Sequence, residues 1–536
     1  MTTKPRVRVK AATAPVTLPS AVRDPSRTGS KFLRDGRSAV FDLRPAALRD
    51  SREEIRVAWK RAAGLALDLI QNSGQLRGAA DQVIADTVGS ELVLNPQPDL
   101  SGLGYSDDEK AEFVATIKRR WKRYAWNPRE CDQRGKFTLP QMIDIALRWD
   151  MAYGEAVGVM SYMTRAQRRQ YGITAGTKVC MMPPPMLVQD TSEMEGIYQG
   201  VIHDPNGRPV AYRFREKETG LYVKRDYRAY DGNGRQVVMH VFDPMDATDV
   251  RGISRIAPAF RQYIQREILV DTTIQTAILQ TVFAATLTSP TPSKDAFEAI
   301  ETLDDDLGSD FKDYFQSALD RAAESEIRIS GDPRVSHLAP GEDLKILSTG
   351  TPGPQFVPVS AELSRDMARA IGITYGGMTM NHTGATYSSV RMENSSVWPV
   401  VVRRRERIAA PPNQAVYENW LDEEIGEGRI PFKGGYAAFA ANRDRVTWAL
   451  WQGPAKPSAD DLKSGKASTE RLLNGTSDLD IECAELGVDA DEVFERRLRW
   501  HRRYVAAGMP SPFVPRNNGK SDLAETEEPP AKREDA

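Results

Sequence analysis

A histidine and two adjacent serines lie close together in the segment GMTMNHTGATYSSVRMENSS, residues 377–396. His382 is one of only five histidines, and Ser388 and Ser389 follow it shortly along the chain. A serine nucleophile needs such an imidazole as its general base, together with an acid that orients the ring. The segment therefore raises the hypothesis of a serine-dependent hydrolase.

The wider sequence gives this hypothesis little support. It has no GxSxG nucleophile elbow, no HExxH metal site, no GxxxxGK[ST] phosphate loop and no paired acidic motif of the metal-dependent nuclease kind. The other histidines are scattered singly, which favours structural roles. We therefore expect no catalytic residue, no metal site, no cofactor and no enzymatic activity, and keep the hydrolase only as an alternative.

Four arginines gather in VVVRRRERIAA, residues 400–410, namely Arg403, Arg404, Arg405 and Arg407. They fall within about one helical turn, so their side chains spread around most of the helix circumference. Two interpretations stay open: a solvated face that forms salt bridges with Glu406, or contact with phosphate groups. The second gains weight only if many copies of this helix face a common axis.

Composition narrows the classes of protein. The 536 residues are 40% hydrophobic and 27% charged, which is enough apolar material for several domain cores. With 72 basic and 74 acidic residues the formal charge is -2, so contact with DNA must come from local patches. No apolar run reaches the length of a bilayer span, and the three cysteines lie far apart, which fits a reducing cytoplasm.

Hydrophobic periodicity predicts an α+β fold that is predominantly α-helical. Residues 51–94 have the pattern of two helices leading into a strand, and in residues 106–128 apolar side chains recur at helical spacing. Turn signals at 204–209 (DPNGRP) and 231–235 (DGNGR) predict hairpins. Residues 1–38 and 516–536 are polar and lack large apolar side chains, so we expect both ends to be disordered.

The centre of the chain predicts a stalk. From Gly252 to about Thr286 the apolar pattern predicts one helix roughly 45 Å long. A second helix is predicted at 356–373, and the residues between the two helices form a smaller module with an acidic segment. A third helical stretch follows the serine segment, with expected kinks or breaks at Pro399 and at Pro411–Pro412.

Eight stretches, in order from about residue 40 to about residue 510, match the pattern of one known family. They are DTVGSELVL (86–94), WNPRECDQRGKFTLPQ (126–141), WDMAYGEAVGVM (149–160), GVIHDPNGRPVAYRF (200–214), HVFDPMDATDVRGISRIAPAF (240–260), HLAPGEDLKIL (337–347), MARAIGITYGGMT with GATYSSVRMENS (367–379 and 384–395), and WQGPAKPSADDLKSGKAS with ECAELGVDADEVFERR (451–468 and 482–497). Together they resemble the lambda-type family of bacteriophage portal proteins. The departures are the missing proline before the lysine of SADDLKSG and the presence of Pro399.

The resemblance implies a portal fold that assembles as a ring, usually of twelve copies, at one capsid vertex. Double-stranded DNA would enter and leave through this ring. The implied regions are a basic arm (1–38), a wing (39–250), a first stem helix (251–286), a clip (287–350), a second stem helix (351–376), a tunnel loop (377–396), a tunnel/wing helix with a return strand (397–452), crown helices (453–515) and a tail (516–536).

The same resemblance implies that the serine segment is a loop that contacts moving DNA without binding it tightly. Glycines and neutral hydroxyl groups offer flexible backbone and weak contacts instead of fixed charge. The candidates for the DNA channel are Gly377, His382, Thr383, Gly384, Thr386, Ser388, Ser389, Arg391, Arg403, Arg404, Arg405 and Arg407. If the arginines face the channel they form a basic band, and if they pair with a neighbouring subunit they hold the ring together.

The implied partners are other copies of the chain, the terminase large subunit, the major capsid, scaffold and protease proteins, the head-tail connector proteins and non-specific double-stranded DNA, with no membrane. Candidates for binding the motor or connector are Asp304, Asp305, Asp306, Asp310 and Asp313 in the clip, although a solvated helix face explains them equally well. The implied location is the virion vertex, with assembly in the host cytoplasm. Another ring-forming head-tail adaptor remains an alternative, although such adaptors are shorter.

Overall fold

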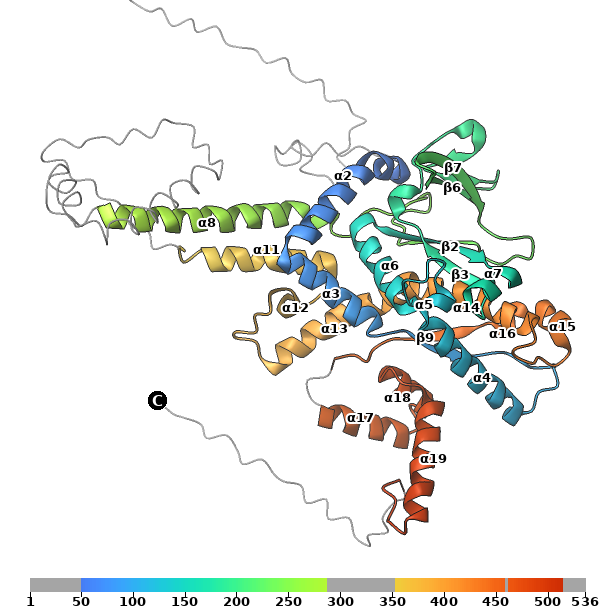
Figure 1. The fold of residues 1–536 in the computed structure, drawn as a ribbon. Helices are drawn as coiled ribbons and strands as arrows, with labels where there is room; N and C mark the ends of the chain where they lie inside the picture. The colour runs from blue at the N-terminus through green and yellow to red at the C-terminus, as the bar shows by residue number, and fades with distance from the viewer. Residues whose placement is uncertain (1–49, 287–351, 458–460, 514–536) are drawn as a thin grey trace, which may run out of the picture. The chain divides into compact units, whose positions relative to one another are not determined.

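The computed structural model describes residues 50–286, 352–457 and 461–513. Helices dominate these residues, and their strands form three small antiparallel sheets (Figure 1). The compact unit that begins at Ser51 contains all of these elements. The expectation of a predominantly helical α+β fold is confirmed. The predicted arm (1–38), clip (287–350) and tail (516–536) lie outside the described residues.

Two helices and a short strand open the unit, as the periodicity predicted. They are α2 (Ser51–Asn72), α3 (Gly74–Val88) and β1 (Val93–Pro96). Ser73 separates the helices and caps α3, because its hydroxyl accepts the backbone N–H of Leu76 at 3.2 Å. Alanines dominate the buried face of α2, so a neighbouring helix can approach it closely.

The helix α4 (Asp107–Ala125) begins with a capping box between Ser106 and Glu109. It buries the predicted apolar stripe of Phe113, Ile117, Trp121 and Tyr124. Trp121 packs edge-on against Trp420, with ring centroids 5.3 Å apart. This aromatic contact joins the N-terminal helices to a later helix in the largest core. The short helix α5 (Pro128–Cys131) and then α6 (Leu139–Tyr153) follow.

A three-stranded sheet lies between two cores, with the order β3-β2-β8. The strands are β2 (Glu155–Tyr162), β3 (Thr177–Met181) and β8 (Val238–Phe242), and α7 (Arg165–Tyr171) lies between β2 and β3 in the sequence. Successive side chains of a strand point to opposite faces. Val157 and Val159 therefore enter the core shared with the second sheet, and Met160 enters the largest core. The middle strand is buried on both faces.

The second sheet has four strands, β4 (Ile197–Tyr198), β5 (Val201–His203), β6 (Pro209–Glu218) and β7 (Leu221–Arg228). The turn at 204–209 joins β5 to β6, as predicted. The hairpin predicted at 231–235 is confirmed only next to its turn, where Tyr230 and Gln236 form an isolated antiparallel bridge. The strands on either side then separate, because β7 pairs with β6 whereas β8 pairs with β2. The β6–β7 turn is at Thr219 and Gly220, which both have positive φ, 45° and 91°.

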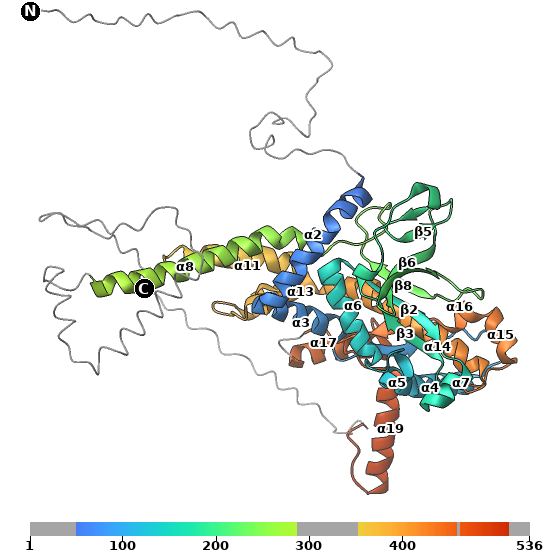
Figure 2. The ribbon, with the colours of Figure 1, turned by 45° about the horizontal axis from the view of Figure 1, so that its top comes forward.

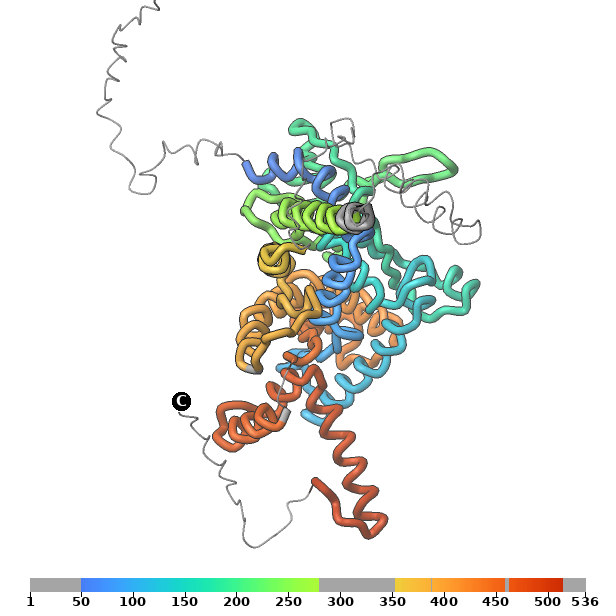
Figure 3. The backbone as a smooth tube through the Cα atoms, turned by 90° about the vertical axis from the view of Figure 1, so that its left-hand side faces the viewer, coloured from blue at the N-terminus to red at the C-terminus, as the bar shows by residue number. Residues whose placement is uncertain are grey.

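Two helices form the predicted stalk, α8 (Phe260–Thr286) and α11 (Phe356–Ile371). They run side by side in opposite directions, and Figure 3 looks along α8 with α11 beside it (Figures 1, 2 and 3). The first begins later than predicted, because residues 251–256 are not helical and a single 3₁₀ turn, η3 (Ala257–Ala259), precedes it. Tyr263, Met367 and Ile371 fix the base of the pair in a separate core with α2 and α3.

A nearly continuous helical run follows the stalk. The short helix α12 (Tyr375–Thr379) and a loop at 380–386 come first. The run itself consists of α13 (Tyr387–Arg404), the π-helical turn η4 (Arg405–Ala409) and α14 (Ala410–Gly426). The chain stays helical through Pro399 and through Pro411–Pro412. In a helix, a proline ring clashes with the carbonyl group four residues earlier. For Pro411 and Pro412 these carbonyls belong to Arg407 and Ile408, which lie in the π turn η4. The prolines therefore distort the helix without ending it.

The last described elements are α15 (Gly435–Ala441), α16 (Arg443–Val446), β9 (Ala449–Gln452), α17 (Asp461–Leu473), α18 (Leu479–Glu485) and α19 (Ala490–Ala506). The strand β9 pairs with β1, with Trp451 opposite Leu94. The first and last parts of the largest core are thus joined in one ladder. None of the helices described here is both long and apolar enough to cross a membrane.

Candidate functional site

The serine segment spans the end of α12, an exposed loop at 380–386 and the start of α13. Every residue from Met380 to Thr386 is exposed, and Gly384 has a φ of 75° that favours glycine. At the N-terminus of α12, the backbone N–H of Gly377 donates to the Thr374 hydroxyl at 3.0 Å. The loop presents neutral groups to solvent, with Arg391 exposed on the first turns of α13.

The hydroxyl of Ser389 serves the start of a helix. The backbone N–H of Thr386 donates to Ser389 Oγ at 2.9 Å, and the N–H of Ser389 donates to Thr386 Oγ1 at 3.2 Å. This reciprocal capping box satisfies donors that the first turn of α13 leaves free. Ser388 is exposed on the same turn. The serine pair therefore has a structural explanation that needs no catalysis.

The side chain of His382 does not complete a catalytic triad. Its ring lies over Gly376, where an added Cβ would come within 2.7 Å of the imidazole. Within the described residues, the ring makes no hydrogen bond to either serine or to a carboxylate, and no group of three or more His, Cys, Asp or Glu side chains could hold a metal ion. The geometry that a serine hydrolase needs is not assembled here.

Substituting Thr386 or Ser389 with alanine is expected to destabilise the start of α13 by about 1 kcal/mol, because each removes one half of the capping box. Ser388→Ala is the matched control, with an expected change within about 0.5 kcal/mol. Amide hydrogen exchange in the first turn of α13 measures the difference. Equal effects at Ser388 and Ser389 would contradict the capping role.

The exposed arginines of the cluster lie beside the carboxylate at the end of β8. Arg403 Nη2 lies 2.9 Å from Asp243 Oδ1, and Arg407 Nη1 lies 3.8 Å from the same oxygen. Asp243 also pairs with Arg255, at 3.3 Å, just before α8. The pairing partner is therefore Asp243 and not the predicted Glu406. Both guanidinium groups remain more than half exposed, which leaves them able to meet a second ligand.

The two middle arginines are buried and point into the protein. Arg404 Nη2 donates to the carbonyl of Ile371 at 2.7 Å, at the last turn of α11, and burial lowers the pKa of this guanidinium to about 10. Arg405 Nε donates to the carbonyl of Thr87 at 2.8 Å, and its Nη2 donates to the carbonyl of Pro454 at 3.1 Å. These contacts fasten the helical run to the stalk base and to α3.

This burial divides the four arginines into two pairs with different roles. A guanidinium enclosed by backbone carbonyls cannot reach a phosphate, so only Arg403 and Arg407 remain candidates for phosphate contact. The guanidinium of Arg405 leaves no room for a side chain at Gly453, because an added Cβ would lie 2.2 Å from Arg405 Nε. The sequence periodicity does not reveal this division, because apolar residues lie three positions from the exposed arginines as well, Val400 from Arg403 and Ala410 from Arg407.

A buried ion pair at the stalk base was missed by the sequence analysis. Arg251 and Glu155 are fully buried, with Arg251 Nε 2.9 Å from Glu155 Oε1, and His240 Nε2 lies 3.0 Å from Glu155 Oε2. Burial by itself raises the pKa of Glu155, but the Arg251 charge and the hydrogen bonds outweigh it and lower that pKa to about 2. The guanidinium also lies over the ring of Trp59, 4.7 Å from its centroid. The pair ties β2, α2 and the approach to α8 together.

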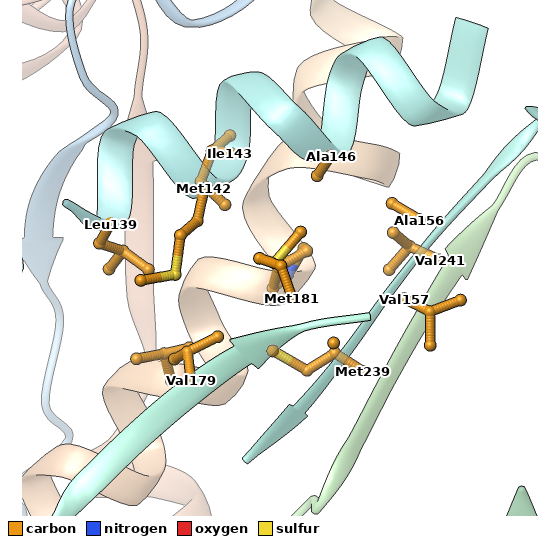
Figure 4. A pocket seen from close by; sticks show the side chains of 13 residues that line it. Leu139, Met142, Ile143, Ala146, Ala156, Val157, Val179, Met181, Met239 and Val241 are labelled. Carbon is orange, nitrogen blue, oxygen red and sulfur yellow. The ribbon is translucent and has the colours of Figure 1, made fainter. Parts of the chain in front are cut away.

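A void behind the three-stranded sheet offers no substrate site. Its volume is about 10 Å³, and apolar side chains of α6 and of the sheet line it (Figure 4). A site for a single water already needs about that volume together with polar partners. We assign this void to imperfect packing of the core.

The amino-acid sequence matches a known family over most of its length. Residues 42–405 fit the family described as phage portal protein, lambda family. The chain belongs to this family. The resemblance inferred from the eight stretches is thereby confirmed, and the protein is a portal protein of the lambda type.

Relatives of this portal protein align over most of both chains. The portal protein of Escherichia phage N15 is 25% identical over 474 residues, covering 85% of this chain and 86% of the relative. Portal protein B of Escherichia phage lambda is 24% identical over 470 residues, with the same coverage. Among solved structures, a chain of the virion of a native gene transfer agent particle is 12% identical, covering 84% of this chain and 98% of its own, with a TM-score of 0.36.

Proposed function

We propose that the chain forms a ring at one vertex of the capsid, that duplex DNA passes through the ring during packaging and ejection, and that the terminase motor and the connector proteins dock on it. Family membership over residues 42–405 carries this proposal. The role is structural and non-enzymatic: the motor hydrolyses ATP, and the ring guides the DNA. About twelve copies are expected, located in the virion and assembled in the host cytoplasm with capsid, scaffold and protease proteins.

The stalk supports assembly into a ring because it exposes aliphatic side chains. Ile264, Ile268 and Ile274 of α8 are 38%, 59% and 52% exposed. At about 100° per residue, these three lie within roughly one third of the helix circumference. Val357 and Val359 of α11 are exposed as well. Apolar area of this kind gains about 25 cal/mol per Å² when it is buried, so neighbouring copies are the natural cover.

The loop between α12 and α13 supports the role of a conduit. Its exposed glycine and threonines, together with the serines on the first turn of α13, bear no charge, so they contact a moving duplex without the salt-sensitive attraction that each cation adds. We assign residues 377–396 to the channel wall, with Arg391 inside this segment and Arg403 and Arg407 after it as exposed basic groups. The acidic cluster from Asp304 to Asp313 remains the proposed docking site for motor and connector, outside the described residues.

Electron microscopy of the purified chain tests ring formation. We expect rings of about twelve subunits around a channel at least as wide as a DNA duplex, roughly 20 Å. The double substitution Ile268→Asp and Ile274→Asp is expected to abolish the rings, because it places charge in the proposed subunit contact. Val57→Asp, at an equally exposed aliphatic site on α2, is the control that should still form rings.

Two results would count against the proposal in different ways. Rings formed equally well by the double variant would remove α8 from the subunit contact. A wild-type chain that stays monomeric even with capsid and scaffold proteins, and is absent from the particles, would remove the portal role. The serine hydrolase alternative predicts instead that Ser388→Ala abolishes a hydrolytic activity while rings persist, and no described geometry favours it.

A further inference from the structure

The helix α19 carries its charges in two blocks. Acidic residues occupy its first turns, whereas five arginines and no acidic residue lie between Arg496 and Ala506. The acidic end is occupied within the chain: Asp489 caps the helix, accepting the N–H of Glu492 at 3.0 Å, and pairs with Lys118 of α4 at 2.6 Å. The start of α19 is therefore held by the rest of the chain, and its basic half is a separate surface.

The chain after α19 folds back and covers one side of the helix. Met509 N–H donates to the carbonyl of Tyr504 at 2.9 Å, and the ring of His501 lies within hydrogen-bond distance, 2.9 Å, of Ser511 Oγ. The guanidinium of Arg497 lies 5.2 Å from the centroid of the Phe513 ring. At 100° per residue, Arg496, Arg499 and Arg503 fall on the opposite side. The returning segment thus leaves an arginine face open.

The open face is not neutralised by its neighbours. Arg499 and Arg502 are exposed and, within the described residues, have no ion pair or hydrogen bond from their side chains. Arg503 stacks on Trp500, which is itself 46% exposed, and Arg496 reaches only Glu492, at 3.4 Å. The helix dipole favours a cation in the last turn, which explains Arg503. It does not explain the arginines of the preceding turns.

We propose that this arginine face of α19, Arg496, Arg499, Arg502 and Arg503 with Trp500, binds the phosphate backbone of duplex DNA without sequence preference. The face extends for about 10 Å along the helix, which spans more than one phosphate of a strand. A guanidinium group binds phosphate oxygens through paired hydrogen bonds. No Asn or Gln lies between Arg496 and Ala506 to read the base edges. The choice of duplex DNA as the ligand rests on the proposed portal function.

The charge of this face contrasts with the neutral loop at 380–386. The whole chain has a formal charge of -2, so attraction to DNA has to be local. A loop that lets DNA slide needs few cations, whereas a surface that holds a DNA segment needs several. In a ring, each copy would repeat the arginine face, and the contacts would add along one polyanion.

Binding to a mixed-sequence duplex of about 30 base pairs measures the contribution of this face. The full-length chain is titrated with the labelled duplex over a salt series. The triple variant R499A/R502A/R503A should bind at least about tenfold more weakly at low salt, and the slope of log affinity against log salt should fall by about three. The triple lysine variant R499K/R502K/R503K should keep most of the affinity, because a phosphate also accepts a point charge.

A matched control removes the same number of exposed arginines elsewhere. The variant R119A/R123A/R169A, on α4 and α7, should bind DNA like the wild type. Equal losses in the two alanine variants, or an unchanged affinity in R499A/R502A/R503A, would overturn the proposal. So would a change in subunit number with unchanged DNA affinity, which would assign the face to a contact between copies. Electron microscopy of all variants separates the two proposals. If the variants form rings but the arginine substitutions leave DNA binding unchanged, the DNA-binding proposal fails and the portal role does not.

Discussion

Replacing Arg251 with methionine is expected to lower the free energy of unfolding by about 3–5 kcal/mol. The guanidinium is fully buried, and it compensates the equally buried carboxylate of Glu155. Removing it leaves that negative charge in a low-dielectric site with only His240 beside it. The backbone carbonyls of Pro184, Leu187 and Gln199 lose donors as well. These losses combine at one place, where β2 meets the approach to the stalk.

Denaturant or thermal unfolding of the purified chain measures this effect. The control is Arg213→Met, because the Arg213 pairs with Asp226 and Glu195 lie at the surface and contribute at most about 1 kcal/mol. Replacing Glu155 by methionine together with Arg251 should recover much of the loss, since no unpaired charge then remains. A double variant as unstable as the single one would show that packing, and not charge, carries the effect.

The contribution of Glu155 also predicts a pH dependence. Its pKa is lowered from 4.5 to about 2 in the folded protein. A carboxylate with a lowered folded pKa stabilises the protein fully above its unfolded pKa, and this stabilisation is lost as the pH falls towards the folded pKa. The contribution of ionised Glu155 to wild-type stability should therefore be complete above pH 4.5 and shrink between pH 4.5 and 2. The stability difference from Arg251→Met should shrink with it and should begin to shrink above pH 4.5, because burial without the Arg251 charge raises the pKa of Glu155 in the folded variant. A difference that is independent of pH in this window would contradict the ion pair.

The second large effect is expected at Arg405, whose replacement by alanine should cost about 3 kcal/mol. Hydrogen bonds from a charged donor contribute about 1.5–3 kcal/mol each, and removing the donor leaves buried carbonyls unsatisfied. The carbonyls affected are those of Thr87 and Pro454, which belong to segments far apart in the sequence. Removing the guanidinium also leaves a gap beside Gly453 and Trp398.

Arg403→Ala is the matched comparison within the same helical run. Its side chain is 55% exposed and, among the residues that the structure describes, pairs with Asp243 alone, so the expected change in unfolding free energy is below about 0.5 kcal/mol. In a packaging assay that compares equal amounts of folded protein, the order of the effects should reverse. Substitutions at Arg403 and Arg407 should then affect DNA translocation more than a substitution at Arg405. If Arg403→Ala destabilised the chain as much as Arg405→Ala, the division of the cluster into buried and exposed pairs would be wrong.

Much of the fold could be predicted from local pattern. The stripe from Phe113 to Tyr124 and the apolar spacing of α8 specify helices, because one side of each helix has to be buried. The order of the strands could not be predicted in this way. The turn at 231–235 forms with one antiparallel bridge, but Val238 and Met239 pack beside β2, so burial in the interior limits the local hairpin to that bridge. Only the distant sequence of β2 could have revealed this.

The candidate site shows the same limit. The loop predicted at 377–396 is present and exposed from Met380 to Thr386, whereas residues 377–379 end α12 and residues 387–396 belong to α13. The pattern RRRER reads as four equivalent cations, but the π turn η4 and the neighbouring carbonyls make two of them structural. An arginine buried against backbone oxygens and an arginine at the surface have the same letter in the sequence. Their difference depends on which segments pack around the helix, which single-sequence periodicity does not contain.

The ladder between β1 and β9 has a consequence for synthesis on the ribosome. The strand at Val93–Pro96 cannot pair until the strand at Ala449–Gln452 has been synthesised. The largest core contains residues from both regions, so it also cannot form completely before then. A ribosome adds about 5–20 residues per second, so the N-terminal half stays without its partner for tens of seconds. The isoleucines of α8 are made within this interval. A nascent chain therefore exposes the proposed subunit contact before the subunit can close around its own core, and we expect correct assembly to require that neighbouring chains stay apart until translation ends.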